Sequence, residues 1–200
     1  AGYYSISLED WRTAMEKKMP LPGRAVVITF DDGYVDFQRF AWPLLKRYGF
    51  SATVFIVAGL AGRINIWDSA YKEEIPLLGW KDIRQLQDEG VTFGSHSVSH
   101  PFLTVLSAEE IVREGARARA ILGRELGVII KAFAYPYGDV DRVVQHCIGA
   151  CGYIFGLSTR KDMSTFHDLL LELPRIEVYG SDRIKDFVEK LGVQSDQGIR

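Results

Sequence analysis

The 200-residue chain is poor in cysteine and has no marked excess of charge. Its only two cysteines, Cys147 and Cys151, stand four residues apart in a segment that we expect to be helical. A disulfide at that spacing is unusual, so we predict two free thiols, and cysteine usage indicates no compartment. The formal net charge is −2, and no run or stripe of basic residues occurs. Nucleic acid is therefore not an expected partner.

The sequence also lacks long apolar segments. None approaches the roughly 20 residues of a transmembrane helix, and the N-terminus has no basic-then-apolar signal segment. Ala1 fits a processed start as well as excision from a longer chain. No repeat, linker or composition shift divides the sequence, and 47% of its residues are apolar. We therefore predict one domain over residues 1–200, with a leading segment at 1–22 and a polar tail at 193–200.

Short apolar runs rich in β-branched residues alternate with stretches of helical periodicity. A short helix should follow Ser7, a candidate cap, and Pro43 should kink or divide the helix that contains it. The pattern predicts strands at 25–30, 52–57, 91–95, 129–134, 153–157 and 172–178, and further helices at 37–48, 81–89, 107–126, 141–151 and, capped by Ser181, up to 191. This alternation is typical of βαβ units and predicts an α/β fold with a parallel sheet or barrel.

Three of the expected strands end on chemically unusual residues, at the end where α/β folds bind their ligands. The first runs into Asp31 and Asp32, the third into His96 and His100, and the fourth into Tyr-Pro-Tyr-Gly at residues 135–138. Neighbouring strand residues point in different directions, so the two aspartates need not share a task. Taken alone, that pair fits equally well a strand end with an Asp-Gly turn and a helix cap.

His96 and His100 have the spacing at which one helical turn brings two imidazoles to the same side, although Pro101 excludes a long regular helix there. A lone histidine is more often a hydrogen-bonded core or surface residue, but two of them directly after a strand favour a metal site. Histidine and carboxylate ligands suit zinc, cobalt or nickel. With Asp32 the count is three ligands, not the four of a structural zinc site, which favours a catalytic centre.

The three motifs together resemble those of a known family. Thr-Phe-Asp-Asp-Gly at 29–33, His-Ser-Val-Ser-His at 96–100 and Tyr-Pro-Tyr-Gly at 135–138 are similar, in order and spacing, to the polysaccharide deacetylases, which share the chitooligosaccharide deacetylase homology domain. The resemblance extends over about residues 21–191. It implies a distorted (β/α) barrel of about seven parallel strands, one divalent metal ion with zinc as the first candidate, and an acetylated glycan substrate. It also implies a location outside the cytoplasm or in the cell envelope.

The resemblance assigns roles by motif position. It makes Asp31 the general base, and the metal ligands would be Asp32, His96 and His100. A bound divalent ion makes hydroxide available near neutral pH and polarises the acetamide carbonyl, while the base takes the proton of the attacking water. Acetate and a free amino sugar would be the products.

The same resemblance predicts the walls of the substrate groove. The main-chain N–H of Tyr137 would help to hold the oxyanion, and Tyr135 and Pro136 would line the groove. The irregular stretch at 58–79 is long for a compact domain, and its Trp67 is a further candidate for contact with the substrate, although ordinary loop packing explains it as well.

The chain departs from the family pattern in two places. The third motif usually begins with an arginine that pairs with the base, but Ala134 stands there, and we expect Arg175 on a late strand to replace it. The alternative for Arg175 is an ordinary exposed strand arginine. The usual Leu-x-His that supplies the general acid is absent, as is any tryptophan after Trp80, and His167 is the candidate acid.

The leading hypothesis is a metal-dependent hydrolase that removes N-acetyl or O-acetyl groups from a polysaccharide or oligosaccharide. A second hypothesis is the opening of a cyclic amide on the same fold. A third is a carbohydrate-binding module with impaired catalysis, which Ala134 and the missing late motifs would favour. The sequence leaves the metal, the glycan and the oligomeric state open.

Overall fold

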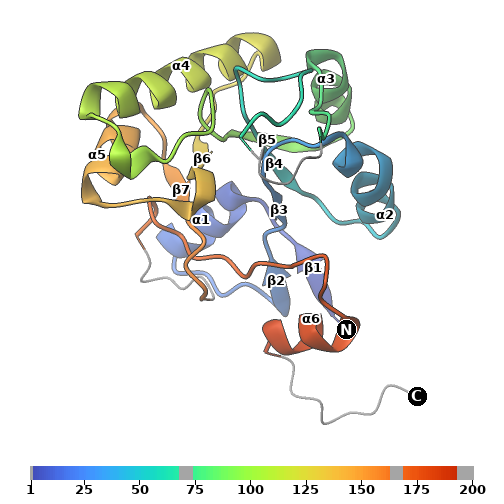
Figure 1. Cartoon of the computed structure of the whole chain (residues 1–200). Coiled ribbons are helices and arrows are strands. Elements are labelled where there is room, and N and C mark those ends of the chain that lie inside the picture. Colours follow the sequence, from blue (N-terminus) through green and yellow to red (C-terminus); the bar gives the residue numbers. More distant parts are fainter. Residues whose placement is uncertain (1, 68–73, 163–168, 193–200) are drawn as a thin grey trace.

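The centre of the fold is a five-stranded parallel sheet. The computed structural model of the chain describes residues 2–67, 74–162 and 169–192. The strands β3 to β7 lie in sequence order across the sheet (Figure 1). They span Thr29–Phe30, Thr53–Ile56, Thr92–Ser95, Ala132–Ala134 and Phe155–Leu157. All four pairings are parallel, with Ile56 beside Ser95, and Ser95 in turn beside Phe133.

A second, two-stranded parallel sheet joins the leading segment to the rest of the chain. It pairs β1, Tyr3–Ser5, with β2, Arg24–Val26. The described residues thus contain seven parallel strands, and the larger sheet curls into an open half-barrel, so the predicted fold class is confirmed. The strand expected over 25–30 is divided in two, because the chain changes its partner from β1 to β4 after Val26.

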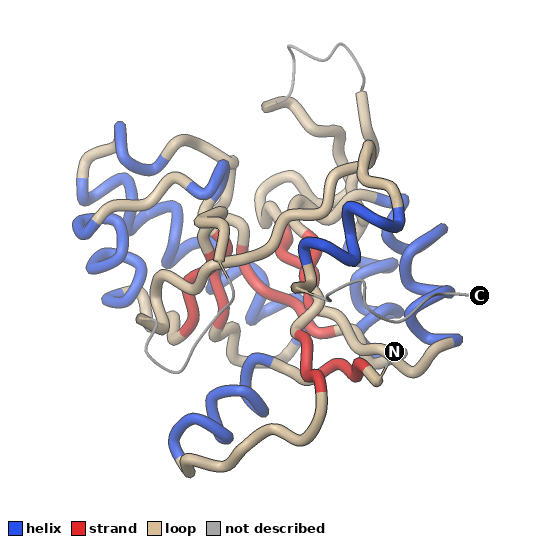
Figure 2. The backbone as a smooth tube through the Cα atoms, turned by 90° about the horizontal axis from the view of Figure 1, so that it is seen from below, coloured by secondary structure: helices blue, strands red, loops and turns tan. Residues whose placement is uncertain are grey.

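Helices flank the strands on both sides (Figure 2). The α-helices are α1 (Leu8–Glu16), α2 (Trp42–Arg47), α3 (Trp80–Asp88), α4 (Ala108–Leu126), α5 (Arg142–Ala150) and α6 (Ile184–Lys190). Shorter turns are the π-helix η1 (Phe37–Ala41), which precedes α2, and the 3₁₀ turns η3 (Leu103–Val105) and η4 (Pro136–Gly138). Helix α4 packs against α3 and α5 (Figure 1). No helix among the described residues is both long and apolar enough to cross a membrane.

Local sequence signals account for several helix boundaries. Ser107 and Glu110 form a reciprocal capping box at the start of α4, and Gly127 ends that helix with a φ of 66°. Ser7 caps α1 in the same way. Pro43 lies in the first turn of α2, directly after η1, so it divides the two helices as expected. Cys147 and Cys151 are free thiols, as predicted.

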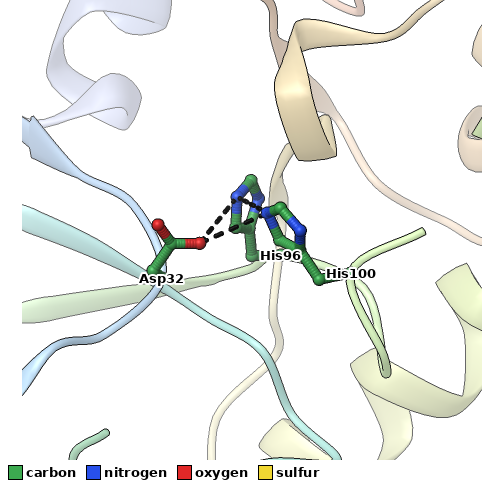
Figure 3. A group of neighbouring side chains, drawn as sticks. All are labelled: Asp32, His96 and His100. Atoms are coloured by element: carbon green, nitrogen blue, oxygen red, sulfur yellow. Dashed lines mark hydrogen bonds and ion pairs between the residues drawn. The ribbon is translucent and has the colours of Figure 1, made fainter. Parts of the chain in front are cut away.

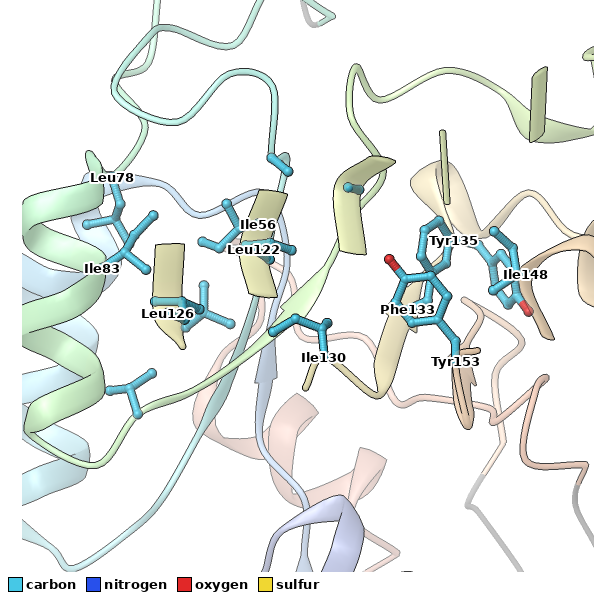
Figure 4. Packing of buried hydrophobic residues seen from close by; sticks show 14 of the residues in the cluster. Ile56, Leu78, Ile83, Leu122, Leu126, Ile130, Phe133, Tyr135, Ile148 and Tyr153 are labelled. Atoms are coloured by element: carbon cyan, nitrogen blue, oxygen red, sulfur yellow. The ribbon is translucent and has the colours of Figure 1, made fainter. Parts of the chain in front are cut away.

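The core lies on both faces of the larger sheet. On one face, Ile56 and Phe133 meet Leu122 of α4 and Ile148 of α5 (Figure 4). On the other, Phe55 packs with Leu8 and Trp11 of α1 and with five further apolar residues of the sheet and its edge. Adjacent strand residues therefore face opposite clusters, as the pleat requires. The leading segment closes one face of the sheet, and the strands are left with both faces buried.

Two predictions near the C-terminus are wrong. Residues 172–178 form no strand; a single bridge joins Leu173 to Leu157, and Pro174 has no N–H with which to continue a ladder. Helix α6 begins at Ile184 after Arg183, not after Ser181, because the Asp186 carboxylate accepts the N–H of Arg183.

Candidate active site

The functional side chains lie just beyond the carboxyl ends of β3 and β5. Asp31 and Asp32 follow β3, and His96 follows β5. Asp32 and His100 adopt left-handed backbone conformations, with φ of 69° and 63°. Such conformations cost non-glycine residues about 1 kcal/mol or more each, and clusters of them are typical of functional sites. The strand ends thus present three side chains toward one point (Figure 3).

Asp32, His96 and His100 form a triangle of candidate metal ligands. Asp32 Oδ1 lies 3.4 Å from His96 Nε2 and 3.3 Å from His100 Nε2, and the two nitrogens are 3.2 Å apart. Ligand atoms placed tetrahedrally around a zinc ion at its usual bond lengths would be about 3.3 Å apart. Among the described residues, this is the group of His, Cys, Asp or Glu side chains whose ligand atoms lie near enough to one another, within 4.8 Å, to share a metal ion.

The surroundings of the triangle also fit an ion. Asp32 Oδ1 is buried and accepts no hydrogen bond from any described residue. A buried polar atom left without a partner costs about 1–3 kcal/mol, and a cation among the three ligand atoms would remove that cost for the carboxylate. The residues present therefore fit one divalent ion, with room in the donor set for water or substrate.

A main-chain carbonyl fixes the orientation of His96. His96 Nδ1 lies 2.8 Å from the carbonyl oxygen of Ala134, which favours the tautomer with Nδ1–H donating and Nε2 directed at the triangle. Burial lowers the pKa of His96, although Asp31 and Asp32 partly oppose it. The imidazole is therefore neutral at pH 7, which is the protonation state of a metal ligand.

Asp31 is held by a bidentate ion pair with Arg175. Arg175 Nη1 donates to Asp31 Oδ1 at 2.8 Å, and Nη2 donates to Oδ2 at 2.6 Å. Arg175 also donates to the main-chain carbonyl of Ser158 and to Thr29 Oγ1. Only 14% of the Arg175 side chain is exposed, so it is not an ordinary surface arginine. The contact that we expected in place of the missing third-motif arginine is present; its part in catalysis stays a prediction.

The charge state of Asp31 follows from this pair. Burial would raise the pKa of Asp31, but the charge of the Arg175 guanidinium and its hydrogen bonds outweigh burial, so the pKa lies below its ordinary value. For Arg175 burial would lower the pKa, yet Asp31 raises it above the usual value. Both groups are charged at neutral pH, and the carboxylate is able to accept a proton.

Aromatic rings surround His100. Trp67 stacks on its imidazole at 4.5 Å, and Tyr137 meets it edge-on at 4.5 Å between ring centroids. Phe102, which sequence reasoning missed, stacks on Tyr137 at 3.9 Å. Phe102 and Tyr137 expose 51% and 41% of their surface, so their rings are available to a ligand. The position of Phe102 two residues beyond a metal-ligand motif, in a loop, was the signal that could have found it.

The side chains of Tyr135 and Pro136 are buried and not exposed to a substrate as we expected. Tyr135 is fully buried against Phe133, and its hydroxyl donates to the carbonyl of Leu171, so the expectation for its side chain is corrected. Pro136 is buried as well, at the start of η4. Tyr135 extends the inward-facing alternation of β6, which explains its place in the core. The candidate acid His167 lies outside the described residues.

Fold and site together define a class of protein: a parallel (β/α) half-barrel with a candidate metal centre and an ion-paired carboxylate at its strand ends. The comparison with known families makes the class specific. Residues 18–156 match the polysaccharide deacetylase family, and the chain therefore belongs to it.

Individual relatives agree with this assignment. The chain is 26% identical over 170 residues to the poly-β-1,6-N-acetyl-D-glucosamine N-deacetylase of Staphylococcus aureus, covering 80% of this chain and 57% of that protein. It is 23% identical over 177 residues to YxkH of Bacillus subtilis, covering 88% and 60%. The chain thus spans less than two thirds of the length of these relatives.

Solved structures share the fold. The Streptococcus pyogenes deacetylase PplD, in complex with acetate, superposes with a TM-score of 0.82 at 27% identity, over 95% of this chain and 80% of that one. IcaB from Ammonifex degensii superposes with a TM-score of 0.78 at 21% identity, over 96% and 82%. The second similarity bears on the fold alone.

Proposed function

We propose that the protein is a metal-dependent hydrolase that removes acetyl groups from a polysaccharide or oligosaccharide. N-acetyl groups are the first candidates and O-acetyl groups the alternative. The observation that supports this most directly is the triangle of Asp32, His96 and His100 beside a carboxylate held by Arg175. Membership of the deacetylase family and the N-deacetylase named among its relatives support the same reaction. A location outside the cytoplasm remains an expectation from the family resemblance.

Asp32, His96 and His100 would hold one divalent ion, for which zinc is the first candidate and cobalt or nickel the alternatives. When bound, such an ion lowers the pKa of coordinated water to about 7 and polarises a carbonyl oxygen. Asp31 takes the proton of the attacking water. Arg175 keeps that carboxylate in one orientation, at the cost of some basicity, because it also lowers the pKa of Asp31.

The remaining groups would bind and orient the substrate. Trp67 and Tyr137 flank His100 and would contact a sugar ring, and the main-chain N–H of Tyr137 would stabilise the oxyanion of the tetrahedral intermediate. The leaving amine must be protonated when the C–N bond breaks. The products are then the free amino sugar and acetate. His167 is the proposed donor.

The impaired-module alternative loses one of its two arguments, because Arg175 pairs with Asp31 where Ala134 supplies no cation; the missing late motifs still favour it. The cyclic-amide alternative remains as an outcome of the test. The test is acetate release from chitin oligosaccharides, poly-N-acetylglucosamine, peptidoglycan and acetylated xylan, by protein stripped with a chelator and reloaded with single metals. Release that depends on metal and disappears in Asp31→Asn supports the proposal.

Stoichiometric metal binding without acetate release from any glycan contradicts deacetylation and favours the cyclic-amide or binding-module hypotheses. Wild-type protein that releases acetate equally well after complete removal of metal contradicts the proposed role of the ion. The two results are distinguishable, because bound metal and acetate are measured separately.

A further inference from the structure

The loop between the two candidate histidine ligands is fixed on one side by the chain that follows β4. The N–H of Ala58 donates to the carbonyl of Ser97 at 3.0 Å, and the N–H of Gly59 donates to the carbonyl of Val98 at 2.9 Å. Within the loop, the N–H of His100 donates to Ser97 Oγ at 2.9 Å. Ser97, like His100, has a positive φ, so the loop conformation requires such support.

The other side of the loop is held by one carboxylate. Glu114 Oε2 accepts the N–H of Val98 at 2.8 Å and the N–H of Ser99 at 3.0 Å, and Oε1 accepts the hydroxyl of Ser99 at 2.9 Å. Hydrogen bonds to a charged acceptor are about twice as strong as neutral ones. Three such bonds therefore connect Glu114 to Val98 and Ser99.

Glu114 is well placed to act as a fixed anchor. It lies in the second turn of the 19-residue helix α4, whose neighbouring residues Ile111 and Ala118 are almost completely buried. In the part of the chain that the structure describes, Glu114 forms no ion pair with lysine or arginine. Its carboxylate is therefore committed to the loop and not to a surface ion pair.

We propose that Glu114 is a positioning residue that sets the separation and direction of the His96 and His100 imidazoles for metal binding. The proposal rests on the proposed metal centre. Groups that orient metal ligands from outside the coordination shell typically contribute 10–100-fold to metal affinity. Here the support acts through the backbone of the loop that joins the two ligands.

A substitution of Gly59 tests the same loop independently of Glu114. A Cβ at this position would lie 2.6 Å from the carbonyl oxygen of Val98 and 2.8 Å from its Cγ1. Gly59→Ala should therefore displace residues 97–99 from the side opposite to Glu114. Both changes are expected to weaken metal binding, although neither residue is a metal ligand.

The experiment is a competition titration of chelator-stripped protein with Zn²⁺ and Co²⁺ against a chromophoric chelator, together with the absorption spectrum of the Co²⁺ form. Glu114→Ala should weaken binding about 10–100-fold and change the Co²⁺ spectrum. Glu114→Gln should recover most of the affinity, because its amide oxygen still accepts from Val98 and Ser99. The matched control is Glu109→Ala, since Glu109 lies on the same helix but, among the described residues, forms its ion pair with the exposed Arg113 and not with the loop.

Thermal unfolding of the metal-free variants separates positioning from stability, since a purely structural role would lower the midpoint without changing the Co²⁺ spectrum of the folded protein. Wild-type affinity and spectrum in Glu114→Ala would overturn the proposal. If that variant does not fold, the other two variants decide. Wild-type affinity in Gly59→Ala, or an affinity of Glu114→Gln no higher than that of Gly59→Ala, overturns the proposal. Wild-type protein that binds neither metal overturns the metal centre itself.

Discussion

Replacement of Arg175 should separate metal binding from hydrolysis. The side chain donates two charge-assisted hydrogen bonds to Asp31, at 2.8 and 2.6 Å, and 28% of the Asp31 side chain is exposed. Bonds to charged groups contribute about 1.5–3 kcal/mol each, and partial exposure places this pair near the lower end, at about 3 kcal/mol in total. If all of that stabilisation serves to orient the base, Arg175→Ala should lower kcat/KM about 100-fold.

The pH profile provides a second measurement. Arg175 lowers the pKa of Asp31, so the wild-type base stays ionised well into the acid range. Without Arg175, burial is the dominant influence, the pKa of Asp31 rises, and the acid limb of kcat/KM should move toward neutral pH. The stability that the ion pair contributes is present above the unfolded-state pKa of Asp31, and it is lost as pH falls through the lower folded-state value.

The assay is acetate release across pH, with metal affinity measured on the same preparations. Arg175→Lys retains the charge but not the bidentate geometry and should give an intermediate rate. Arg113→Ala, which removes an exposed arginine of α4, is the control and should leave both rate and profile unchanged. Full activity of Arg175→Ala, or an acid limb that does not move, would refute the reasoning.

Three further changes test other parts of the site. Asp32→Asn should lower metal affinity at least 100-fold and abolish acetate release, measured by competition titration; retained tight binding would exclude Asp32 as a ligand. Tyr135→Phe, which leaves the carbonyl of Leu171 without its donor, should lower the free energy of unfolding by about 1 kcal/mol in urea titrations, while an altered KM would show that Tyr135 contacts substrate after all. Asp139 accepts hydrogen bonds from the N–H and the hydroxyl of Thr104 and so connects η4 to η3. Asp139→Ala should therefore lower kcat and leave metal affinity unchanged. A loss of metal affinity in this variant would contradict the prediction.

Local sequence patterns predicted much of the fold. The capping box at Ser107, the stop at Gly127 and the division at Pro43 depend on residues within one or two turns, and the structure has all three. The metal-ligand triangle could also be predicted from the sequence, because its motifs follow strands whose carboxyl ends lie at the same edge of a parallel sheet. Arg175 was found from a gap in a motif: Ala134 left the base without its usual cation.

The wrong predictions have a common physical origin. Residues 132–135 alternate between the two core clusters, but both faces of the sheet are buried, so no polar-apolar alternation indicates which way Tyr135 points. The stretch 172–178 has the composition of a strand, yet pairing depends on a neighbouring edge far away in the sequence. Such choices are made by tertiary contacts, which local patterns do not contain.

The distance along the chain between Asp31 and Arg175 has a consequence for how the protein is made. The two residues are separated by 144 positions, whereas the three candidate metal ligands all lie within the first 100 residues. During synthesis from the N-terminus, the candidate ligands, together with Glu114 and Ala134 that hold them, are therefore made before the partner of the base. The ion pair that orients the proposed base would therefore form last, when the segment beyond β7 packs against the sheet. A chain cut short after that strand would retain the ligands and lack the cation that orients its base.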